Sequence, residues 1–229
     1  KDSGLPGTSR YITTKNKKAK TIAVVEKSSS QASIISDLTI NIGSGSEYAV
    51  ASTKTFTSTT ISLYILSKYI YSKKQNIDFD HNEIVEELEE LNDKVALILN
   101  DQHKIKEISK EFSKLKHILF LGRDIMYPVA MEGALKMKEV CYIHAEAYPA
   151  GEMKHGVNAL IGEKMPSLVM APTGISFNKM LSTINEIKAR DGEVIGLTDN
   201  DSNEFTSLLS SYLIIDSFNF NLDVILYSI

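Results

Sequence analysis

The sequence predicts an α/β protein in which parallel sheets lie between layers of helices. Short apolar runs rich in β-branched residues recur, each bounded by Gly, Asp, Asn, Ser or Pro as buried parallel strands are, at 21–25, 38–42, 117–122, 167–172, 193–198 and 212–216. Segments with helical periodicity fall between these runs, at 52–73, 82–99, 102–114, 126–143, 176–190 and 203–211. Because strand and helix alternate, we expect right-handed crossovers and a three-layer α/β/α fold.

The predicted strands fall into two groups, separated by a highly charged stretch. Residues 77–114 show no strand pattern and read as two amphipathic helices. The upstream part, 1–76, shows two strands, and the downstream part, 115–229, shows four. We therefore expect two tandem α/β subdomains joined by helices, the first incomplete and the second truncated at its C-terminal end. The chain starts without methionine and stops inside an apolar segment, so we expect a fragment of a longer protein.

Composition excludes several classes of function. The chain has 229 residues, of which 43% are hydrophobic and 24% charged, enough to bury a real core. The net charge of −4 and the absence of a long basic cluster argue against nucleic acid or an anionic membrane as a partner. No apolar run approaches the roughly 18 residues of a membrane span. The single cysteine, Cys141, excludes a disulfide framework, so we expect a cytoplasmic protein.

A Gly/Ser loop at residues 43–57, GSGSEYAVASTKTFT, is the first place where chemistry is expected. Ligands of parallel α/β folds bind beyond the carboxyl ends of the strands, near helix N-termini. Ser52 or Thr53 would cap the helix that follows, and the free backbone N–H groups there would form a site for an anion or a sugar hydroxyl. The alternative is that the loop is only a capped turn.

The predicted helix 126–143 carries a second candidate cluster, in MEGALKMKEVC. Glu132, Lys136 and Glu139 form one stripe, at i,i+4 and i,i+3 spacing. Such a stripe is usually a solvated surface. However, the helix follows a strand, so its early turns should lie at the carboxyl edge of the sheet, where a lysine could hold a glutamate base ionised. Cys141 falls on the apolar face and is expected in the core rather than as a nucleophile.

The third candidate is the segment 145–156, AEAYPAGEMKHG, which its proline and glycines should keep from forming a regular helix. His155 lies close to two glycines, so its backbone is free to approach a ligand. An imidazole titrates near neutrality and can move a proton to or from a sugar oxygen. The alternative is a hydrogen-bonded loop histidine. No metal site is expected, because His144 and His155 are too far apart for a helical pair and no cysteine cluster joins them.

Three stretches resemble one family: VASTKTFT (50–57), FLGRDIMYPVAMEGALKMKEVCYIHAEAYPAGEMKHG (120–156) and NALI (158–161) are similar to the isomerase part of glutamine–fructose-6-phosphate aminotransferases. The resemblance implies a sugar isomerase (SIS) type fold. It also implies an enzyme that joins ammonia, released from glutamine by a separate glutaminase domain, to fructose 6-phosphate and isomerises the product to glucosamine 6-phosphate. It further implies a cytoplasmic homodimer that needs no metal or organic cofactor for the isomerisation.

The resemblance also implies roles for individual residues. Glu139 matches the base that shuttles a proton between C1 and C2 of the open-chain sugar, and Lys136 matches the lysine that supports this step. His155 matches the histidine that opens the sugar ring, acting in the site of the neighbouring subunit. Val50 and Ser52 match residues that contact the sugar through backbone and hydroxyl groups.

Some family features are altered or missing in this sequence. The family's phosphate loop is of the Ser-Gln-Ser-Gly-Glu-Thr type, and its nearest counterpart is DSGLPGTS, where Ser3, Thr8 and Ser9 are the candidate phosphate ligands. The family's KHGP is KHGV, with Val157 in place of proline. The family's C-terminal Schiff-base lysine and its glutaminase domain are not in the sequence, so we expect that this chain alone does not make glucosamine 6-phosphate.

Two other functions remain open at the level of sequence. One is a non-catalytic sugar-phosphate-binding module built on the same fold, which the altered phosphate loop favours. The other is a different ketose-phosphate isomerase or a deglycase. The Lys136, Glu139 and His155 set argues against a pure binding module, because a sensor needs no proton shuttle.

Overall fold

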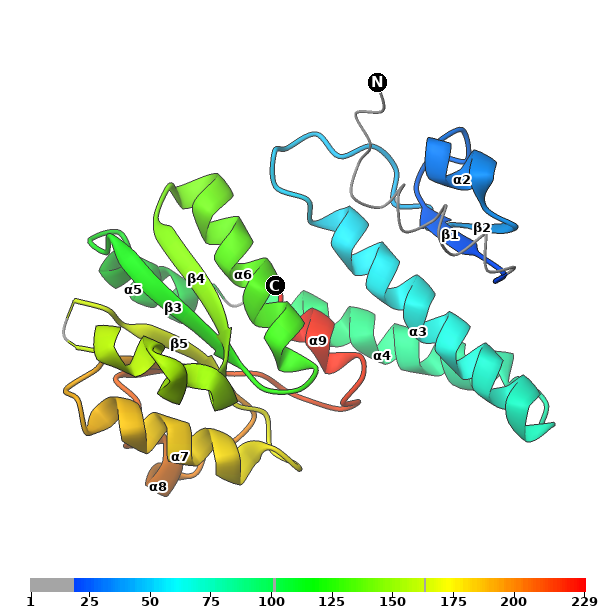
Figure 1. Cartoon of the computed structure of the whole chain (residues 1–229). Helices are drawn as coiled ribbons and strands as arrows, with labels where there is room; N and C mark the ends of the chain where they lie inside the picture. Colours follow the sequence, from blue (N-terminus) through cyan, green and yellow to red (C-terminus); the bar gives the residue numbers. More distant parts are fainter. Residues whose placement is uncertain (1–18, 101, 163) are drawn as a thin grey trace. The chain divides into compact units, whose positions relative to one another are not determined.

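A computed structural model of the protein describes residues 19–100, 102–162 and 164–229 (Figure 1). The chain divides into two compact units, Lys1–Asp80 and His81–Ile229. The candidate phosphate ligands Ser3, Thr8 and Ser9 lie outside the described residues. No helix in the described ranges is long and apolar enough to cross a membrane.

The first unit contains both of the strands expected there. Strands β1 (Ile22–Val25) and β2 (Leu38–Asn41) pair in parallel, with helix α2 (Gln31–Ile35) between them in sequence. Helix α3 (Lys54–Gln75) follows and ends at Asn76, which adopts the left-handed conformation common at helix C-termini.

The second unit begins with the two amphipathic helices that the charged stretch predicted, α4 (His81–Asn100) and α5 (His103–Phe112). Ile84 and Leu91 of α4 and Ile108 of α5 are buried, while most of the charged side chains of the two helices remain exposed.

A five-stranded parallel sheet forms the centre of the second unit, in the order β4-β3-β5-β6-β7. Its strands are β3 (His117–Gly122), β4 (His144–Pro149), β5 (Ser167–Met170), β6 (Val194–Thr198) and β7 (Ser211–Ile214). The helices of this part are α6 (Met126–Cys141), α7 (Phe177–Lys188), α8 (Asn203–Thr206) and α9 (Asp223–Leu226). Four of these strands match the prediction, and β4 does not.

The segment 145–156 forms no regular α-helix, as expected, but its first part is a strand that the sequence did not predict. Residues 144–149 pair with β3 along its full length, and two short 3-10 helices follow, η1 (Ala150–His155) and η2 (Val157–Leu160). Pro149 is tolerated because β4 lies at the edge of the sheet, where its missing N–H breaks no ladder with an outer neighbour. The sequence alone does not show this strand because its pairing with β3 and its packing against α6 stabilise it.

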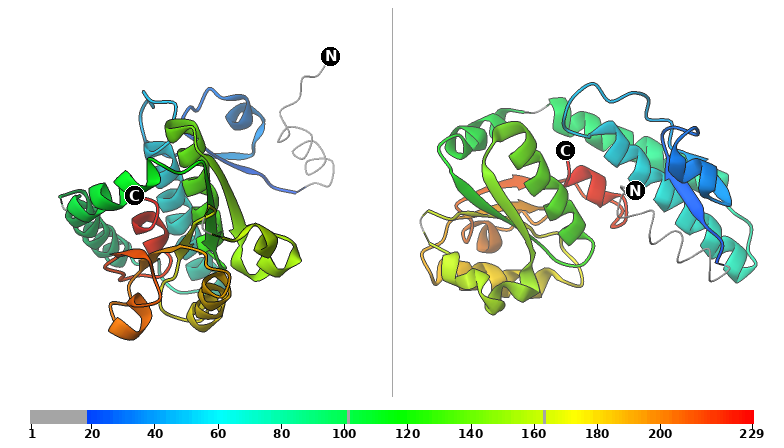
Figure 2. Two further views of the ribbon diagram at one scale, coloured as in Figure 1. Left: turned by 90° about the vertical axis from the view of Figure 1, so that its left-hand side faces the viewer. Right: turned by 45° about the horizontal axis from the view of Figure 1, so that its top comes forward.

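The sheet is covered on both faces, which confirms the three-layer α/β/α prediction. Leu119 and Leu121 of β3 pack in one core cluster with Met180 and Ile184 of α7. The intervening Phe120 points to the other face, where its ring lies against Gly133 of α6. Since successive side chains of a strand point to opposite faces, α6 and α7 lie on opposite sides of the sheet (Figures 1 and 2).

The helix expected over 203–211 is shorter than the sequence indicates. Helix α8 ends at Thr206, and the next residues turn through hydrogen bonds from Leu208 N to Phe205 O and from Leu209 N to Thr206 O. Ser210 N then donates to Val194 O, which brings the chain into the sheet as β7. The helical periodicity of the sequence continues to residue 211, but pairing of β7 with β6 ends the helix earlier.

Candidate active site

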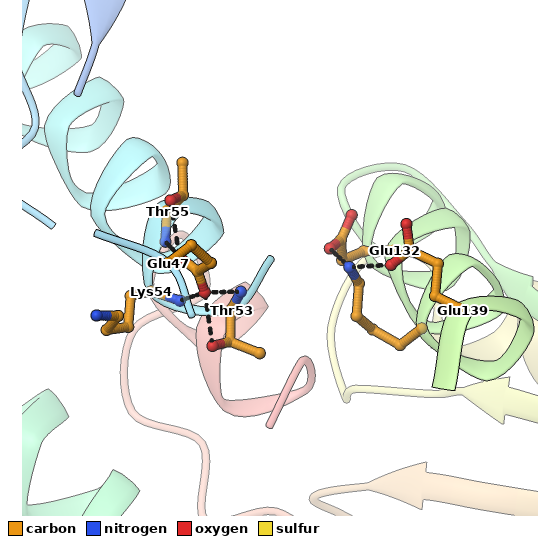
Figure 3. A network of polar contacts seen from close by, with 7 residues as sticks. Glu47, Thr53, Lys54, Thr55, Glu132 and Glu139 are labelled. Carbon is orange, nitrogen blue, oxygen red and sulfur yellow. Dashed lines mark hydrogen bonds and ion pairs between the residues drawn. The ribbon is translucent and has the colours of Figure 1, made fainter. Parts of the chain in front are cut away.

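Lys136 lies between two carboxylates on the surface of α6. Its Nζ is 2.8 Å from Glu139 Oε2 and 3.3 Å from Glu132 Oε1. The exposed fractions of the three side chains are 23% for Lys136, 20% for Glu132 and 29% for Glu139, so none projects freely into solvent. Figure 3 shows both glutamates directed at the same ammonium. The i,i+3 and i,i+4 spacing thus forms a compact ion cluster rather than an open charged stripe.

The two carboxylates determine the charge of the lysine. Burial of Lys136 opposes its positive charge, but hydrogen bonds to Glu139 and then to Glu132 outweigh this effect and raise the pKa of Lys136. The ammonium therefore stays protonated at neutral pH and supplies a fixed positive charge beside both glutamates.

The position of this cluster differs from the expectation that it lies at the carboxyl edge of the sheet. Only the start of α6, at Met126, lies there, directly after β3. Glu139 lies in the last turn, about 20 Å further along at 1.5 Å per residue. Because a crossover helix runs back along the sheet, this turn lies toward the amino ends of β3 and β4.

The carboxyl edge itself holds a small cavity of about 20 Å³, lined by Arg123, Asp124, Thr173 and Ser176 among others. Such a volume accommodates about one water molecule and not a hexose phosphate. A larger open groove, of about 280 Å³, lies between α5 and β7. Neither cavity is lined by Lys136 or Glu139.

His155 occupies the end of η1 and is largely exposed, with 76% of its side chain accessible. Its nearest ionic neighbour among the described residues is Glu152, with Nε2 3.8 Å from Oε2. The segment is anchored by Ala150 and Met153, which are buried in the core cluster beside β3. Gly151 lies close to Arg123, since an added Cβ would be 3.2 Å from Arg123 Nη1. The structure thus holds η1 against the sheet and leaves the imidazole facing outward, with no described contact to the Lys136 cluster.

The two predicted sugar-contacting residues lie just before α3 in the first unit. Val50 is exposed, with 86% of its surface accessible, and Ser52 is partly buried. Thr53 occupies the cap position of α3, as one of the two predictions had it, but its side chain does not cap the helix.

Glu47 performs the capping instead. Its carboxylate accepts hydrogen bonds from the backbone N–H groups of Thr53 at 2.8 Å, Lys54 at 3.2 Å and Thr55 at 3.2 Å (Figure 3). The hydroxyls of Thr53 and Thr55 also donate to it. These hydrogen bonds, led by the one from Thr53 N, lower the pKa of Glu47 to about 2. The expectation of free N–H groups ready for an anion was therefore wrong, because an internal carboxylate already satisfies them.

A second glutamate organises the preceding part of the same loop. Glu26, directly after β1, accepts hydrogen bonds from Ser44 N at 2.7 Å, from Ser44 Oγ at 2.9 Å and from Gly45 N at 3.0 Å. The hydrogen bond from the Ser44 hydroxyl is the main reason that the pKa of Glu26 is lowered. Sequence reasoning missed both glutamates, although for Glu47 an acidic residue shortly before a helix start was an available signal.

Cys141 is exposed, so the expectation that it fills the core was wrong. The neighbouring residues Val140 and Tyr142 are exposed as well, at 59% and 91%. No described residue therefore covers the end of α6 at Val140 and Cys141.

Sequence comparisons identify the family. Residues 111–214 match the SIS domain model. The chain is 41% identical over 183 residues to the glutamine–fructose-6-phosphate aminotransferase [isomerizing] of Aquifex aeolicus, covering 80% of this chain and 30% of that protein. It is 42% identical over 168 residues to the Escherichia coli K12 protein of the same name, covering 73% and 27%. The chain thus spans less than a third of the length of these relatives.

Solved structures agree with this result. The C-terminal domain of glucosamine-fructose-6-phosphate aminotransferase from Francisella tularensis superposes with a TM-score of 0.76 at 34% identity, covering 93% of this chain and 64% of that one. Tagatose-6-phosphate ketose/aldose isomerase from Escherichia coli superposes with a TM-score of 0.70 at 15% identity, covering 98% and 63%, which shows the fold alone. The chain therefore belongs to the SIS family and is homologous to the isomerase region of the glutamine–fructose-6-phosphate aminotransferases.

Proposed function

We propose that this chain is the sugar-isomerase part of an enzyme that converts fructose 6-phosphate and glutamine-derived ammonia to glucosamine 6-phosphate. The names of the relatives at 41% and 42% identity support this reaction. The glutaminase that would release the ammonia lies, in this proposal, in a region outside these 229 residues.

The observation that carries the proposal is the contact of 2.8 Å between Lys136 Nζ and Glu139 Oε2. Glu139 acts as the base: it removes a proton from C1 of the acyclic sugar that carries nitrogen at C2. The substrate for this step is the protonated imine at C2. The electrons of the broken C–H bond form a C1–C2 double bond, and the C2–N double-bond pair moves to nitrogen. The same carboxyl group then returns the proton to C2, while the C1 hydroxyl gives up its proton to the amine and becomes the aldehyde. Lys136 provides the positive charge beside the carboxylate before the proton is taken.

The remaining site residues belong to the same proposal. Val50 and Ser52 contact the sugar from the loop before α3. His155 opens the sugar ring in the site of a neighbouring subunit, so the working form is a homodimer. The high exposure of its imidazole supports this role, because a side chain that serves another subunit must project away from its own. The free Cys141 thiol suits a cytoplasmic location.

A second candidate is a sugar-phosphate-binding SIS module without catalysis. One observation favours it: Lys136 and Glu139 line neither of the two cavities described above. In that case the ion cluster would only stabilise α6.

Exchange of the C1 hydrogen of fructose 6-phosphate with solvent separates the two candidates. The full-length protein is incubated with the sugar in heavy water, and loss of the C1 proton signal is followed by NMR. We expect exchange in the wild type and a reduction of about 10² to 10⁴ in Glu139→Gln, because a positioned base contributes this much. Glu132→Gln, which also removes a carboxylate from Lys136 but not the base, is the matched control and should lose much less.

Two results would contradict the proposal. Absence of exchange in the wild type would favour the binding module. Normal turnover in Glu139→Gln would show that another group is the base.

A further inference from the structure

Two histidines face each other at the start of neighbouring strands. His117 is the first residue of β3 and His144 the first residue of β4, and the parallel register places them directly opposite one another. Both side chains are exposed. Their Nδ1 atoms are 3.1 Å apart, and the ring planes are inclined by 77°. The two imidazoles thus approach each other through the same ring nitrogen, Nδ1.

We propose that this pair binds one divalent transition-metal ion through the two Nδ1 atoms. Zinc–imidazole bonds are about 2.0–2.1 Å long, so two nitrogens on one ion lie about 2.8–3.4 Å apart for angles between 90° and the tetrahedral angle. The observed separation of 3.1 Å falls in this range. Backbone pairing fixes the two Cα positions opposite one another, because each histidine sits on a strand of the same sheet.

Glu146 lies beside the second ring nitrogen of His144. Its Oε1 lies 3.5 Å from Nε2 of His144, the nitrogen that faces away from His117. His144 and Glu146 are two apart on β4 and therefore share one face of the strand. A carboxylate beside Nε2 favours the proton on that nitrogen and leaves the Nδ1 lone pair free, as in the carboxylate–histidine–metal arrangements of known sites.

Without a metal, the short contact is a hydrogen bond in which one Nδ1–H donates to the other Nδ1. Binding of an ion requires that the shared proton leaves this position. For His117 the proton can move to Nε2, because the ring is exposed and solvent can accept a hydrogen bond there. Metal binding therefore replaces this hydrogen bond by a bond from each Nδ1 to the ion.

The ligand type determines the class of ion. Neutral imidazole suits Zn²⁺, Ni²⁺ and Cu²⁺, whereas Mg²⁺ and Ca²⁺ prefer oxygen ligands. The described residues contain no group of three or more His, Cys, Asp and Glu side chains placed to hold a metal ion. The proposed site therefore has two protein ligands, and water completes the coordination. It does not depend on the proposed isomerase function.

Isothermal titration of the tag-free protein with NiCl₂ or ZnCl₂ at pH 7.5 tests the proposal. We expect one ion per chain and no binding of MgCl₂ under the same conditions. Removal of a partner that only orients a metal-binding histidine typically weakens affinity about 10- to 100-fold, which is the loss expected for Glu146→Gln. His117→Ala and His144→Ala each remove a ligand and should cost at least as much. His103→Ala, a histidine beside Glu107 on α5, is the matched control and should bind as the wild type does.

The wild type should also gain thermal stability with increasing Ni²⁺, because an ion that binds only the folded state stabilises it. His117→Ala and His144→Ala should lose this gain and keep the melting temperature of the metal-free wild type, since both side chains are exposed. Absence of saturable Ni²⁺ and Zn²⁺ binding in the wild type would overturn the proposal. Equal affinity in the wild type and in the two alanine variants would overturn it as well.

Discussion

The ammonium of Lys136 donates a hydrogen bond of 2.8 Å to Glu139, which lies one helical turn further along α6. Its second carboxylate neighbour, Glu132, is more distant at 3.3 Å and lies one turn earlier. The lysine is therefore held between an upstream and a downstream carboxylate, with the shorter contact to the residue proposed as the base. This asymmetry gives Glu132 and Glu139 different expected effects when each is replaced.

Replacement of Lys136 by Met should destabilise the fold by about 1 kcal/mol at neutral pH, because it removes two ion pairs and leaves two carboxylates side by side. The raised pKa of Lys136 sets the pH dependence. Because folding raises the pKa of Lys136 above its unfolded value of 10.5, the charged lysine stabilises the fold fully at a pH below 10.5. This stabilisation is lost as the pH rises through the pKa that Lys136 has in the folded chain. Urea unfolding at pH 7.5 and at pH 11 measures this difference. An equal loss at both pH values would contradict the assignment.

Acid should weaken the start of α3 through Glu47. The pKa of Glu47 is about 2 in the folded chain and 4.5 without the structure. Because folding lowers the pKa of Glu47, its carboxylate stabilises the folded chain at a pH above 4.5, the unfolded pKa. This stabilisation is lost as the pH falls from about 4.5 toward 2. In Glu47→Gln, the stability of this helix start should no longer fall between pH 4.5 and 2. Glu89→Gln, at an exposed position on α4, is the control and should lose stability as the wild type does. Hydrogen exchange of the first-turn amides of α3 at pH 3 and pH 6 reports the effect. Identical pH responses in wild type and Glu47→Gln would be inconsistent with the cap.

Gly122→Ala should destabilise the second unit by about 2–3 kcal/mol, because the new methyl group would meet the backbone of Met126 and Tyr127, which cannot move as a side chain could. Gly162→Ala is the matched control, since no atom lies within 4 Å of its added methyl group. Denaturant unfolding followed by circular dichroism compares the two variants. If both behaved like the wild type, the turn between β3 and α6 would be looser than the structure shows.

The proposed delivery of His155 to a neighbouring subunit predicts that two inactive variants rescue each other. Glu139→Gln retains His155, and His155→Ala retains Glu139. In a homodimer, mixing and reassembling equal amounts gives about half hybrid dimers, each with one intact site, and thus about a quarter of wild-type activity. Recovered turnover is measured after unfolding and refolding the mixture. A mixture that remains as inactive as its components would show that His155 acts within its own chain or not at all.

Local patterns in the sequence predicted much of this protein. Among the described residues, six of the seven strands were placed close to their observed bounds, because their apolar, β-branched runs are typical of parallel strands. In β3, β5 and β6 these runs are buried on both faces of the sheet. The ion cluster of Lys136 was predicted for a similar reason. Its partners are three and four residues away, and helical geometry by itself brings residues at that spacing together.

Other features depend on which segments meet in the folded chain. Strand β4 forms because β3 is available to pair with it, and this pairing sets His117 opposite His144, 27 residues later. Glu26 likewise reaches a loop 18 residues away. The sequence itself determined the elements whose contacts lie within one helix turn or one strand. Only the tertiary structure decided contacts between distant segments, because strand register and loop paths, unlike helix periodicity, impose no fixed spacing along the chain.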